Sequence, residues 1–224
     1  PLLNLYKLHF STDKDFVKKL KNILGFVPGN VALYKMAFRH RSVAKVLKNG
    51  SRSSNERLEF LGDAILGAVI AELLFKSYPY KEEGFLTEMR SKIVNRVNLN
   101  QLAKKMGFDQ LITFDQKTVN VQTKHHSMLG DAFEALVGAV YLDKGYNFTQ
   151  NFLLKRIVKP YIDIHTLEMT ETNFKSKLIE WCQRHGKDIS FDMVENGDGE
   201  SAKLFTIHAI IDGENHGIGR DYNK

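Results

Sequence analysis

Cysteine and long apolar runs are scarce in this sequence of 224 residues. Cys182 is its single cysteine, which excludes an intramolecular disulfide and favours a reducing cytoplasm. Apolar runs such as Ile65–Ala71 are far shorter than the roughly 20 residues that a membrane span needs. The chain also lacks the layout of a secretory signal, and because it starts with Pro1 instead of Met we expect residues to precede it. These absences predict a cytoplasmic protein without a membrane segment.

Charge is unevenly distributed, although the formal net charge is only +6. Residues 1–172 contain 25 basic and 17 acidic side chains, whereas residues 173–224 contain seven basic and nine acidic ones. A basic body suits a polyanionic substrate such as nucleic acid, but excess lysine is also a common means of keeping a protein soluble. Charge alone leaves both interpretations open.

Three carboxylates lie close together in residues 56–64, which read Glu-Arg-Leu-Glu-Phe-Leu-Gly-Asp-Ala. At about 100° per residue, Glu56, Glu59 and Asp63 fall within about 60° of one another on a helix. Like charges on one helix face repel, so the arrangement costs stability unless a cation lies there. Either a metal ion binds this face, or it is an ordinary solvated helix surface.

A second segment, residues 126–141, repeats the pattern with Asp131 and Glu134. Apolar residues, including Leu129 and Val137, lie on the opposite side of the same helix. If the two helices packed with their acidic faces together, five carboxylates would form a pocket of oxygen ligands. Such ligands, with no cysteine nearby and no histidine on the same faces, favour Mg²⁺ or Mn²⁺ over zinc. Solvated surfaces are the alternative here too.

Helical periodicity dominates residues 13–164, and a different pattern follows. Besides the two acidic helices, the predicted helices are 15–24, one from about 31, 87–106 and 147–164. A polar segment, 165–172, is predicted to link this all-α domain, 13–164, to a small α+β domain, 173–224. The small domain is predicted to begin with a helix at 173–185, in which Trp181 and Cys182 belong to the core. Strands follow at 190–195, 203–212 and about 216–220, and a turn at 196–199 joins the first two.

Four motifs, in this order, resemble the ribonuclease III family of double-strand-specific endoribonucleases. They are residues 37–42 (Ala-Phe-Arg-His-Arg-Ser), 55–64, 83–91 and 127–143. Residues 173–224, with Phe-Thr-Ile-His at 205–208 and Gly-Ile-Gly at 217–219, resemble a double-stranded-RNA-binding domain. The last helix of that domain family would begin where this sequence stops, so we expect a C-terminally incomplete domain.

The resemblance implies a metal-dependent nuclease site made of Glu59, Asp63, Asp131 and Glu134, with Asp63 and Glu134 nearest the chemistry. Mg²⁺ would be the cofactor, and Mn²⁺ could substitute. The products would carry 5′-phosphate and 3′-hydroxyl ends with short 3′ overhangs. Precursors of ribosomal RNA and other structured transcripts would be the substrates.

Further residues have roles that the resemblance implies less directly. RNA contacts are expected from Glu56 and from Lys175, Lys177 and Gln183 on the first helix of the small domain. Phe60 lies about 40° from Glu56 on the helical wheel, where an aromatic is either core or an anchor in a partner. The resemblance favours the anchor, in a symmetric homodimer.

Basic residues near the first and third motifs are open to two interpretations. Arg39, His40, Arg41 and Arg96 could steer phosphates or lie on solvated helix faces. A non-cleaving RNA-binding protein on the same scaffold is an alternative for the whole chain, as is a small-molecule metal phosphohydrolase. Non-cleaving relatives lose acidic residues, and all five carboxylates are present here, so the nuclease is preferred.

Overall fold

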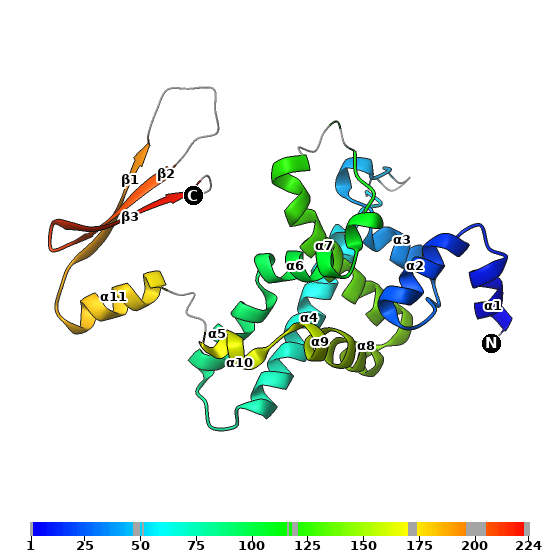
Figure 1. Ribbon diagram of the computed structural model, residues 1–224, viewed down its shortest axis with the longest axis horizontal. Coiled ribbons are helices and arrows are strands. Elements are labelled where there is room, and N and C mark those ends of the chain that lie inside the picture. The colour runs from blue at the N-terminus through cyan, green and yellow to red at the C-terminus, as the bar shows by residue number, and fades with distance from the viewer. Residues whose placement is uncertain are drawn as a thin grey trace. The chain divides into compact units, whose positions relative to one another are not determined.

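The computed structural model divides the chain into two units, residues 1–170 and residues 171–224. It describes residues 2–46, 50, 52–115, 117, 121–169, 174–195 and 205–221. In the first unit the elements are helical (Figure 1): α1 (Leu2–His9), α2 (Lys14–Leu24), α3 (Val31–Ala37), η1 (Arg41–Val43), α4 (Glu56–Ser77), α5 (Glu83–Val94), α6 (Arg96–Lys105), η2 (Phe108–Gln110), α7 (Val121–Lys144), α8 (Tyr146–Phe152), a π-helical segment η3 (Leu153–Val158), α9 (Lys159–Tyr161) and α10 (Ile164–Met169).

Helices α4 and α7 pack against each other at the centre of this unit with their backbones in direct contact (Figure 1). A Cβ atom on Gly62 of α4 would lie 1.7 Å from the carbonyl oxygen of Glu134. A Cβ atom on Gly138 of α7 would lie 2.4 Å from the carbonyl oxygen of Leu58. No side chain larger than hydrogen fits at either position, so this pair of glycines sets how closely the two acidic helices approach.

Aromatic side chains fill the core around these two helices. Phe38, Phe108 and Phe133 are almost completely buried. The ring centroids of Phe38 and Phe108 are 5.1 Å apart in an edge-on arrangement, and those of Phe108 and Phe133 are 6.2 Å apart. This cluster joins the end of α3 to η2 and α7, and so holds the segment that follows α3 against the acidic helix.

The prediction of a single helix over residues 87–106 is wrong, because helix α5 ends at Val94 and a separate helix, α6, begins after Asn95. Asn95 is extended (φ −67°, ψ 156°), and its side-chain oxygen accepts a hydrogen bond from the backbone N–H of Asn98 at 2.9 Å. Its amide group donates to the carbonyl oxygen of Lys92 at 2.9 Å. Asn95 therefore caps a new helix, α6, which begins at Arg96.

The start of α3 is tied to the end of α7 by one carboxylate. Asp143 accepts hydrogen bonds from the backbone N–H groups of Gly29 and Asn30, at 2.7 and 2.8 Å, and from the Tyr34 hydroxyl at 3.0 Å. The Gly29 and Tyr34 hydrogen bonds help to lower the pKa of Asp143 although burial opposes them. These contacts hold α3 against the end of α7 and so help to position the residues that follow Phe38.

Helix α10 occupies part of the range predicted to be a linker. Its Glu168 accepts a hydrogen bond from the Tyr78 hydroxyl at 3.2 Å and lies 4.0 Å from Lys81 Nζ. Both partners belong to the connection between α4 and α5. The contacts place α10 in the first unit, and the domain boundaries drawn from the sequence stay predictions.

The second unit has the predicted α-β-β-β order: α11 (Phe174–Arg184), β1 (Ile189–Glu195), β2 (Phe205–Ile211) and β3 (Glu214–Asp221). The strands form an antiparallel sheet in the order β1-β2-β3, with a bulge between Ala209 and Ile210. The predicted fold class is therefore confirmed.

Cys182 is buried as expected, but Trp181 is 45% exposed and stacks on His185 with ring centroids 4.4 Å apart, so the assignment of Trp181 to the core was wrong. The turn expected at 196–199 lies outside the described residues.

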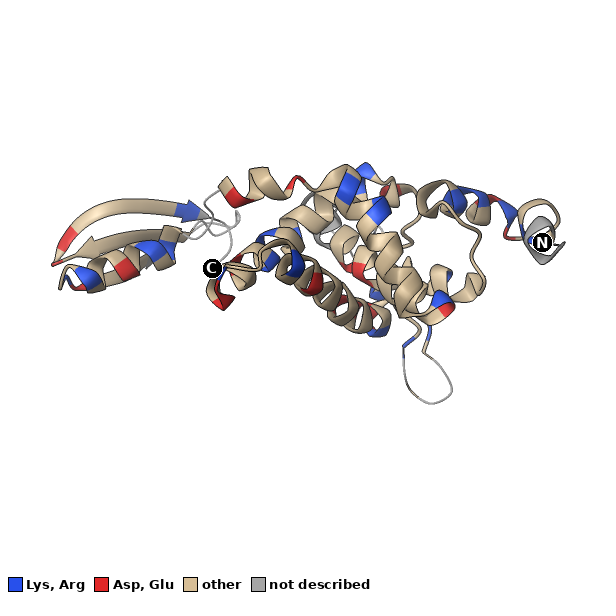
Figure 2. Ribbon diagram, turned by 90° about the horizontal axis from the view of Figure 1, so that it is seen from below, with Lys and Arg blue, Asp and Glu red and all other residues tan. Residues whose placement is uncertain are grey.

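Charged residues of both signs are interspersed along the helices (Figure 2). Helix α11 carries Lys175, Lys177 and Arg184 together with Glu180. Within the part of the chain that the structure describes, no helix is long and apolar enough to cross a membrane.

Candidate metal centre and its cleft

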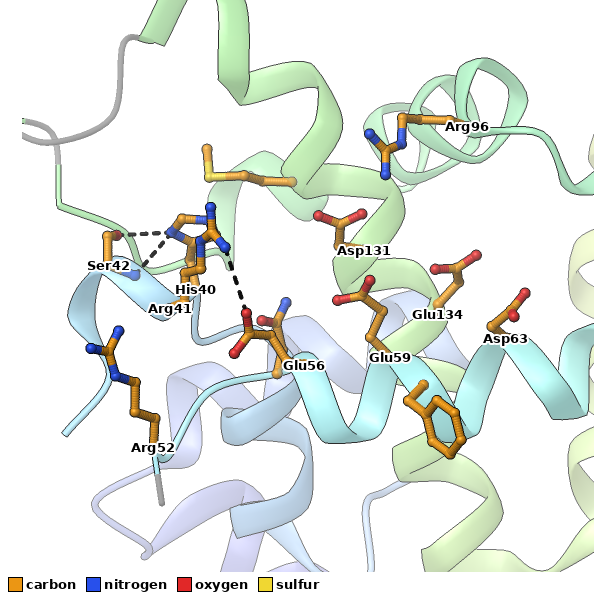
Figure 3. A pocket seen from close by; sticks show the side chains of 13 residues that line it. His40, Arg41, Ser42, Arg52, Glu56, Glu59, Asp63, Arg96, Asp131 and Glu134 are labelled. Atoms are coloured by element: carbon orange, nitrogen blue, oxygen red, sulfur yellow. Dashed lines mark hydrogen bonds and ion pairs between the residues drawn. The ribbon is translucent and has the colours of Figure 1, made fainter. Parts of the chain in front are cut away.

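A cleft of about 1200 Å³ opens where α4 and α7 meet η1 and the first residue of α6 (Figure 3). Acidic side chains line one part of it and basic side chains another. The lining residues are His40, Arg41, Ser42, Arg52, Asn55, Glu56, Glu59, Phe60, Asp63, Arg96, Met128, Asp131 and Glu134.

Three carboxylates from the two central helices converge in this cleft. Glu59 of α4 and Asp131 and Glu134 of α7 each offer an oxygen atom, and these atoms all lie within 4.8 Å of one another. Figure 3 shows the three side chains turned toward a common space. The backbone contact at Gly62 brings the helices close enough for carboxylates some seventy residues apart in sequence to share one site.

The other two acidic residues of the first motif lie on either side of this group. Asp63, one turn beyond Glu59, is exposed and lines the cleft, but it is outside the group of three. Glu56 lies at the opposite end, where it accepts a hydrogen bond from the Ser54 hydroxyl at 3.0 Å and pairs with Arg41 at 3.8 Å. Glu56 therefore contacts the basic part of the cleft and not the carboxylate group.

Burial makes these carboxylates weaker acids than usual, and repulsion between them adds to the effect for Glu59 and Glu134. Burial, followed by the charges of Asp63, Glu59 and Asp131, raises the pKa of Glu134 to about 7. Burial is also the largest cause of the raised pKa of Glu59, and the charge of Asp131 adds to it. A divalent cation among these oxygens would offset both the cost of burying their negative charges and the repulsion between them.

Basic residues oppose this effect from across the cleft. Burial raises the pKa of Asp131, and Arg96, His40 and Arg41 partly offset the rise. Arg96 reaches the cleft because α6 starts at that residue, as the cap at Asn95 dictates. Arg52 also lines the cleft, although its only signal in the sequence is its position in the polar segment before the first acidic motif.

Phe60 lies at this cleft with its side chain 82% exposed. Of the two interpretations drawn from the sequence, burial in the core of the same chain is therefore excluded. An exposed aromatic ring beside a polar cleft is suited to insertion into a partner.

The residues expected to contact RNA outside the first motif all lie in the second unit. Lys175, Lys177 and Gln183 are exposed on α11. The ammonium group of Lys175 lies 4.8 Å from the centre of the Phe191 ring, which couples the helix to the first strand.

Comparison with known proteins supplies an independent description of both units. A family model described as ribonuclease-III-like matches residues 30–161, and one described as a double-stranded RNA binding motif matches residues 174–224. The chain is 45% identical to a ribonuclease 3 of Azobacteroides pseudotrichonymphae over 224 residues, covering all of this chain and 84% of that protein. It is 43% identical to a ribonuclease 3 of Bacteroides fragilis, covering 97% of this chain and 74% of that protein.

A solved structure has a fold similar to that of the first unit. The nuclease domain of ribonuclease III from Campylobacter jejuni superimposes with a TM-score of 0.57 at 32% identity, covering 65% of this chain and 98% of that domain. That nuclease domain shows structural flexibility in a region involved in dimer formation.

Proposed function

The chain belongs to the ribonuclease III family and is an endoribonuclease for double-stranded RNA, and we propose that it cuts duplexes with Mg²⁺ held by Glu59, Asp131 and Glu134. The observation that carries the proposal is the convergence of three carboxylates from two helices within 4.8 Å, in a cleft with basic residues beside them. A bound cation would stabilise three partly buried carboxylates held this close together, which the alternative of two solvated helix faces does not account for.

The residues present fit a hard divalent cation. The three donors are carboxylate oxygens, and the chain's single cysteine is buried in the second unit. Oxygen ligands suit Mg²⁺, for which Mn²⁺ can substitute. Asp63, next along α4, would join the ligand set directly or through water, and we place Asp63 and Glu134 nearest the reacting phosphate.

Bound metal would act as a Lewis acid on the phosphodiester and lower the pKa of an attacking water. Glu59, Asp131 and Glu134 would fix the position of the metal ion. Arg96, which faces them across the cleft, would partly neutralise the negative charge of the phosphate. We propose 5′-phosphate and 3′-hydroxyl products, which result when water attacks phosphorus and the 3′ oxygen leaves.

The second unit would supply much of the affinity for RNA. We propose that Lys175, Lys177 and Gln183 on α11 contact the duplex, because they are exposed on a unit that matches a double-stranded RNA binding motif. A-form RNA is recognised mainly by its shape and its 2′-hydroxyl groups, so sequence preference should be weak. Glu56, which lies 3.8 Å from Arg41 at the edge of the cleft, would also contact the RNA.

We further propose that two copies form a symmetric dimer through Phe60. Two sites related by a twofold axis would cut both strands with a stagger and leave short 3′ overhangs. The substrates would be precursors of ribosomal RNA and other structured transcripts in the cytoplasm, in keeping with the bacterial sources of the relatives.

Phe60→Ala should weaken the dimer by about 30-fold or more, because a buried aromatic anchor at an interface contributes about 2 kcal/mol or more. Sedimentation equilibrium over a range of concentrations measures the change. Phe75→Ala is the matched control, since Phe75 is also exposed on α4 but lies outside the cleft. Equal dimerisation of the Phe60 variant and the wild type would reject the anchor.

The activity is tested by incubating the purified chain with a long RNA duplex, with and without Mg²⁺, and mapping both ends of the products. Staggered cuts that require the metal and leave 5′-phosphates are expected. Binding without cleavage at any Mg²⁺ concentration would instead indicate a non-cleaving RNA-binding protein. Hydrolysis of free nucleotides with indifference to duplex RNA would indicate a small-molecule phosphohydrolase.

A further inference from the structure

Helix α7 is held against α6 as well as against α4, and the contact with α6 lies beside the metal site (Figure 1). The backbone N–H of Gly130 on α7 donates a hydrogen bond to Oδ1 of Asn100 on α6 at 2.7 Å. Gly130 directly precedes Asp131, one of the three converging carboxylates. An amide side chain of α6 therefore bonds to the backbone of α7 one residue away from a proposed metal ligand.

The absence of a side chain at Gly130 allows this close approach. A Cβ atom there would lie 2.8 Å from Asn100 Oδ1 and 3.5 Å from the Cβ atom of Leu99. The first distance is too short for a carbon atom and an oxygen atom that are not bonded, so a larger residue would displace the Asn100 side chain. Gly130 and Leu99 are both buried, and a hydrogen bond is stronger where water is largely excluded.

Helix α6 also carries the arginine that faces the carboxylates. Arg96 is the first residue of α6 and lies four residues before Asn100, so both belong to the same side of the helix. Its guanidinium faces Asp131 across the cleft (Figure 3). The cap at Asn95 ties the start of α6 to α5, whereas the side chain of Asn100 ties α6 to α7. The position of Arg96 relative to the carboxylates of α7 therefore depends on the contact at Asn100.

We propose that Asn100 is a positioning residue for the metal site: its hydrogen bond to the Gly130 N–H sets how α6 lies on α7 and so holds the Asp131 carboxylate opposite the Arg96 guanidinium. The inference rests on the proposed function. Asn100 is half-buried and lies outside the cleft, so it acts through Asp131 and Arg96 and touches neither metal nor RNA. A ligand that is already held in place gives a higher affinity for the metal.

Asn100→Ala removes the acceptor and leaves every carboxylate in the chain. Its dissociation constant for Mn²⁺ should rise by about tenfold, the lower end of the loss that follows removal of a group supporting a metal ligand. Electron paramagnetic resonance of free Mn²⁺, with the whole chain and no RNA, measures the change. Gln150→Ala is the matched control, because it removes an amide hydrogen bond of the same length, 2.7 Å, between α8 and α4 outside the cleft. It should lower the melting temperature to a similar extent and leave Mn²⁺ affinity unchanged.

Gly130→Ala breaks the same hydrogen bond from the other side, because the new methyl group would displace the Asn100 side chain. It should weaken Mn²⁺ binding by about the same factor as Asn100→Ala. The double variant should bind no more weakly than the weaker single variant, because the hydrogen bond is already absent in each. Independent effects would multiply instead, to about 100-fold.

Cleavage of duplex RNA gives a second measurement. In Asn100→Ala the Mg²⁺ concentration for half-maximal cleavage should rise by about tenfold, whereas kcat at saturating Mg²⁺ should stay within about threefold of the wild type, since all the ligands are still present. A loss confined to kcat would overturn the proposal. So would wild-type Mn²⁺ affinity in Asn100→Ala, an equal loss in Gln150→Ala, or losses that multiply in the double variant.

Glu134→Ala identifies the Mn²⁺ binding that belongs to this site. The variant should lose that binding. If it binds Mn²⁺ as the wild type does, the proposed metal centre itself fails, and the role of Asn100 fails with it.

Discussion

Glu134→Ala should lower Mg²⁺-dependent cleavage of duplex RNA by about three orders of magnitude or more, an increase of about 4 kcal/mol in the activation barrier. Glu134 shares the group of three oxygens with Glu59 and Asp131, and its pKa, about 7, is the most strongly raised of the three. The substitution removes a ligand and lowers the negative charge that attracts the metal. Single-turnover cleavage rates at saturating enzyme measure the loss without interference from product release.

Glu82→Ala is the matched control, because Glu82 is an exposed glutamate that makes no side-chain capping bond at the start of α5. It should cleave at the wild-type rate. RNA binding by the Glu134 variant should be largely retained, since the second unit is untouched. Near-normal cleavage by this variant would remove Glu134 from the metal site.

The raised pKa of Glu134 also predicts how the metal-free protein responds to pH. The folded state holds this proton more tightly than the unfolded state, where the pKa is 4.5, so stability falls as pH rises from about 4.5 through about 7. Allowing for solvent screening of a partly buried group, the loss is about 1–2 kcal/mol. Glu134→Gln should therefore raise the free energy of unfolding by that amount at pH 8 and leave it unchanged at pH 4, as urea titrations would measure. Added Mg²⁺ should stabilise the wild type more than the variant.

Gly62→Ala should destabilise the first unit by about 3 kcal/mol and lower its melting temperature by about 10 °C. The new methyl group would lie 1.7 Å from the Glu134 carbonyl oxygen, so α4 and α7 must move apart. The carboxylates of the two helices would separate with them, and the Mg²⁺ concentration for half-maximal cleavage should rise by about tenfold or more.

Gly67→Ala provides the control on the same helix. A Cβ atom at Gly67 meets no heavy atom within 4 Å, and alanine is favoured over glycine in a helix by about 1 kcal/mol, so this variant should be as stable as the wild type or more stable. Calorimetry of the two variants side by side separates loss of helix packing from any general effect of alanine. If both melt like the wild type, the close approach of the helices does not depend on Gly62.

Much of the site followed from short-range patterns in the sequence. Glu59, Asp131 and Glu134 were singled out because a helix repeats every 3.6 residues, and local spacing is enough to place side chains on one face. The same periodicity identified helices α4 and α7, and the loss of that periodicity marked the second unit. The interruption of the helix at Asn95 was not predicted, because the apolar stripe continues through that position. Asparagine is nevertheless a favoured N-cap residue, and Asn95 caps α6 by accepting from the backbone N–H of Asn98.

Other features depended on contacts between distant segments. Asp63 and Glu56 lie on the same helix face as Glu59, so local spacing could not distinguish the three. Only the structure shows that Asp63 lies outside the converging carboxylates and that Glu56 turns toward Arg41. Trp181 was assigned to the core by its spacing, yet it is partly exposed, because periodicity alone does not show which face of a helix a neighbouring element covers.

The sequence by itself determined the family, the helical character of the first unit, the α-β-β-β order of the second, and a set of carboxylates that could bind a metal. These depend on residue identity and on spacing within single elements. Only the tertiary structure decided how the carboxylates meet, through the glycine contact of α4 with α7, and that a basic end with His40 continues the same cleft. The physical reason is that a binding site is a matter of distances between elements, and those distances are set by backbone packing and long-range hydrogen bonds that no local pattern records.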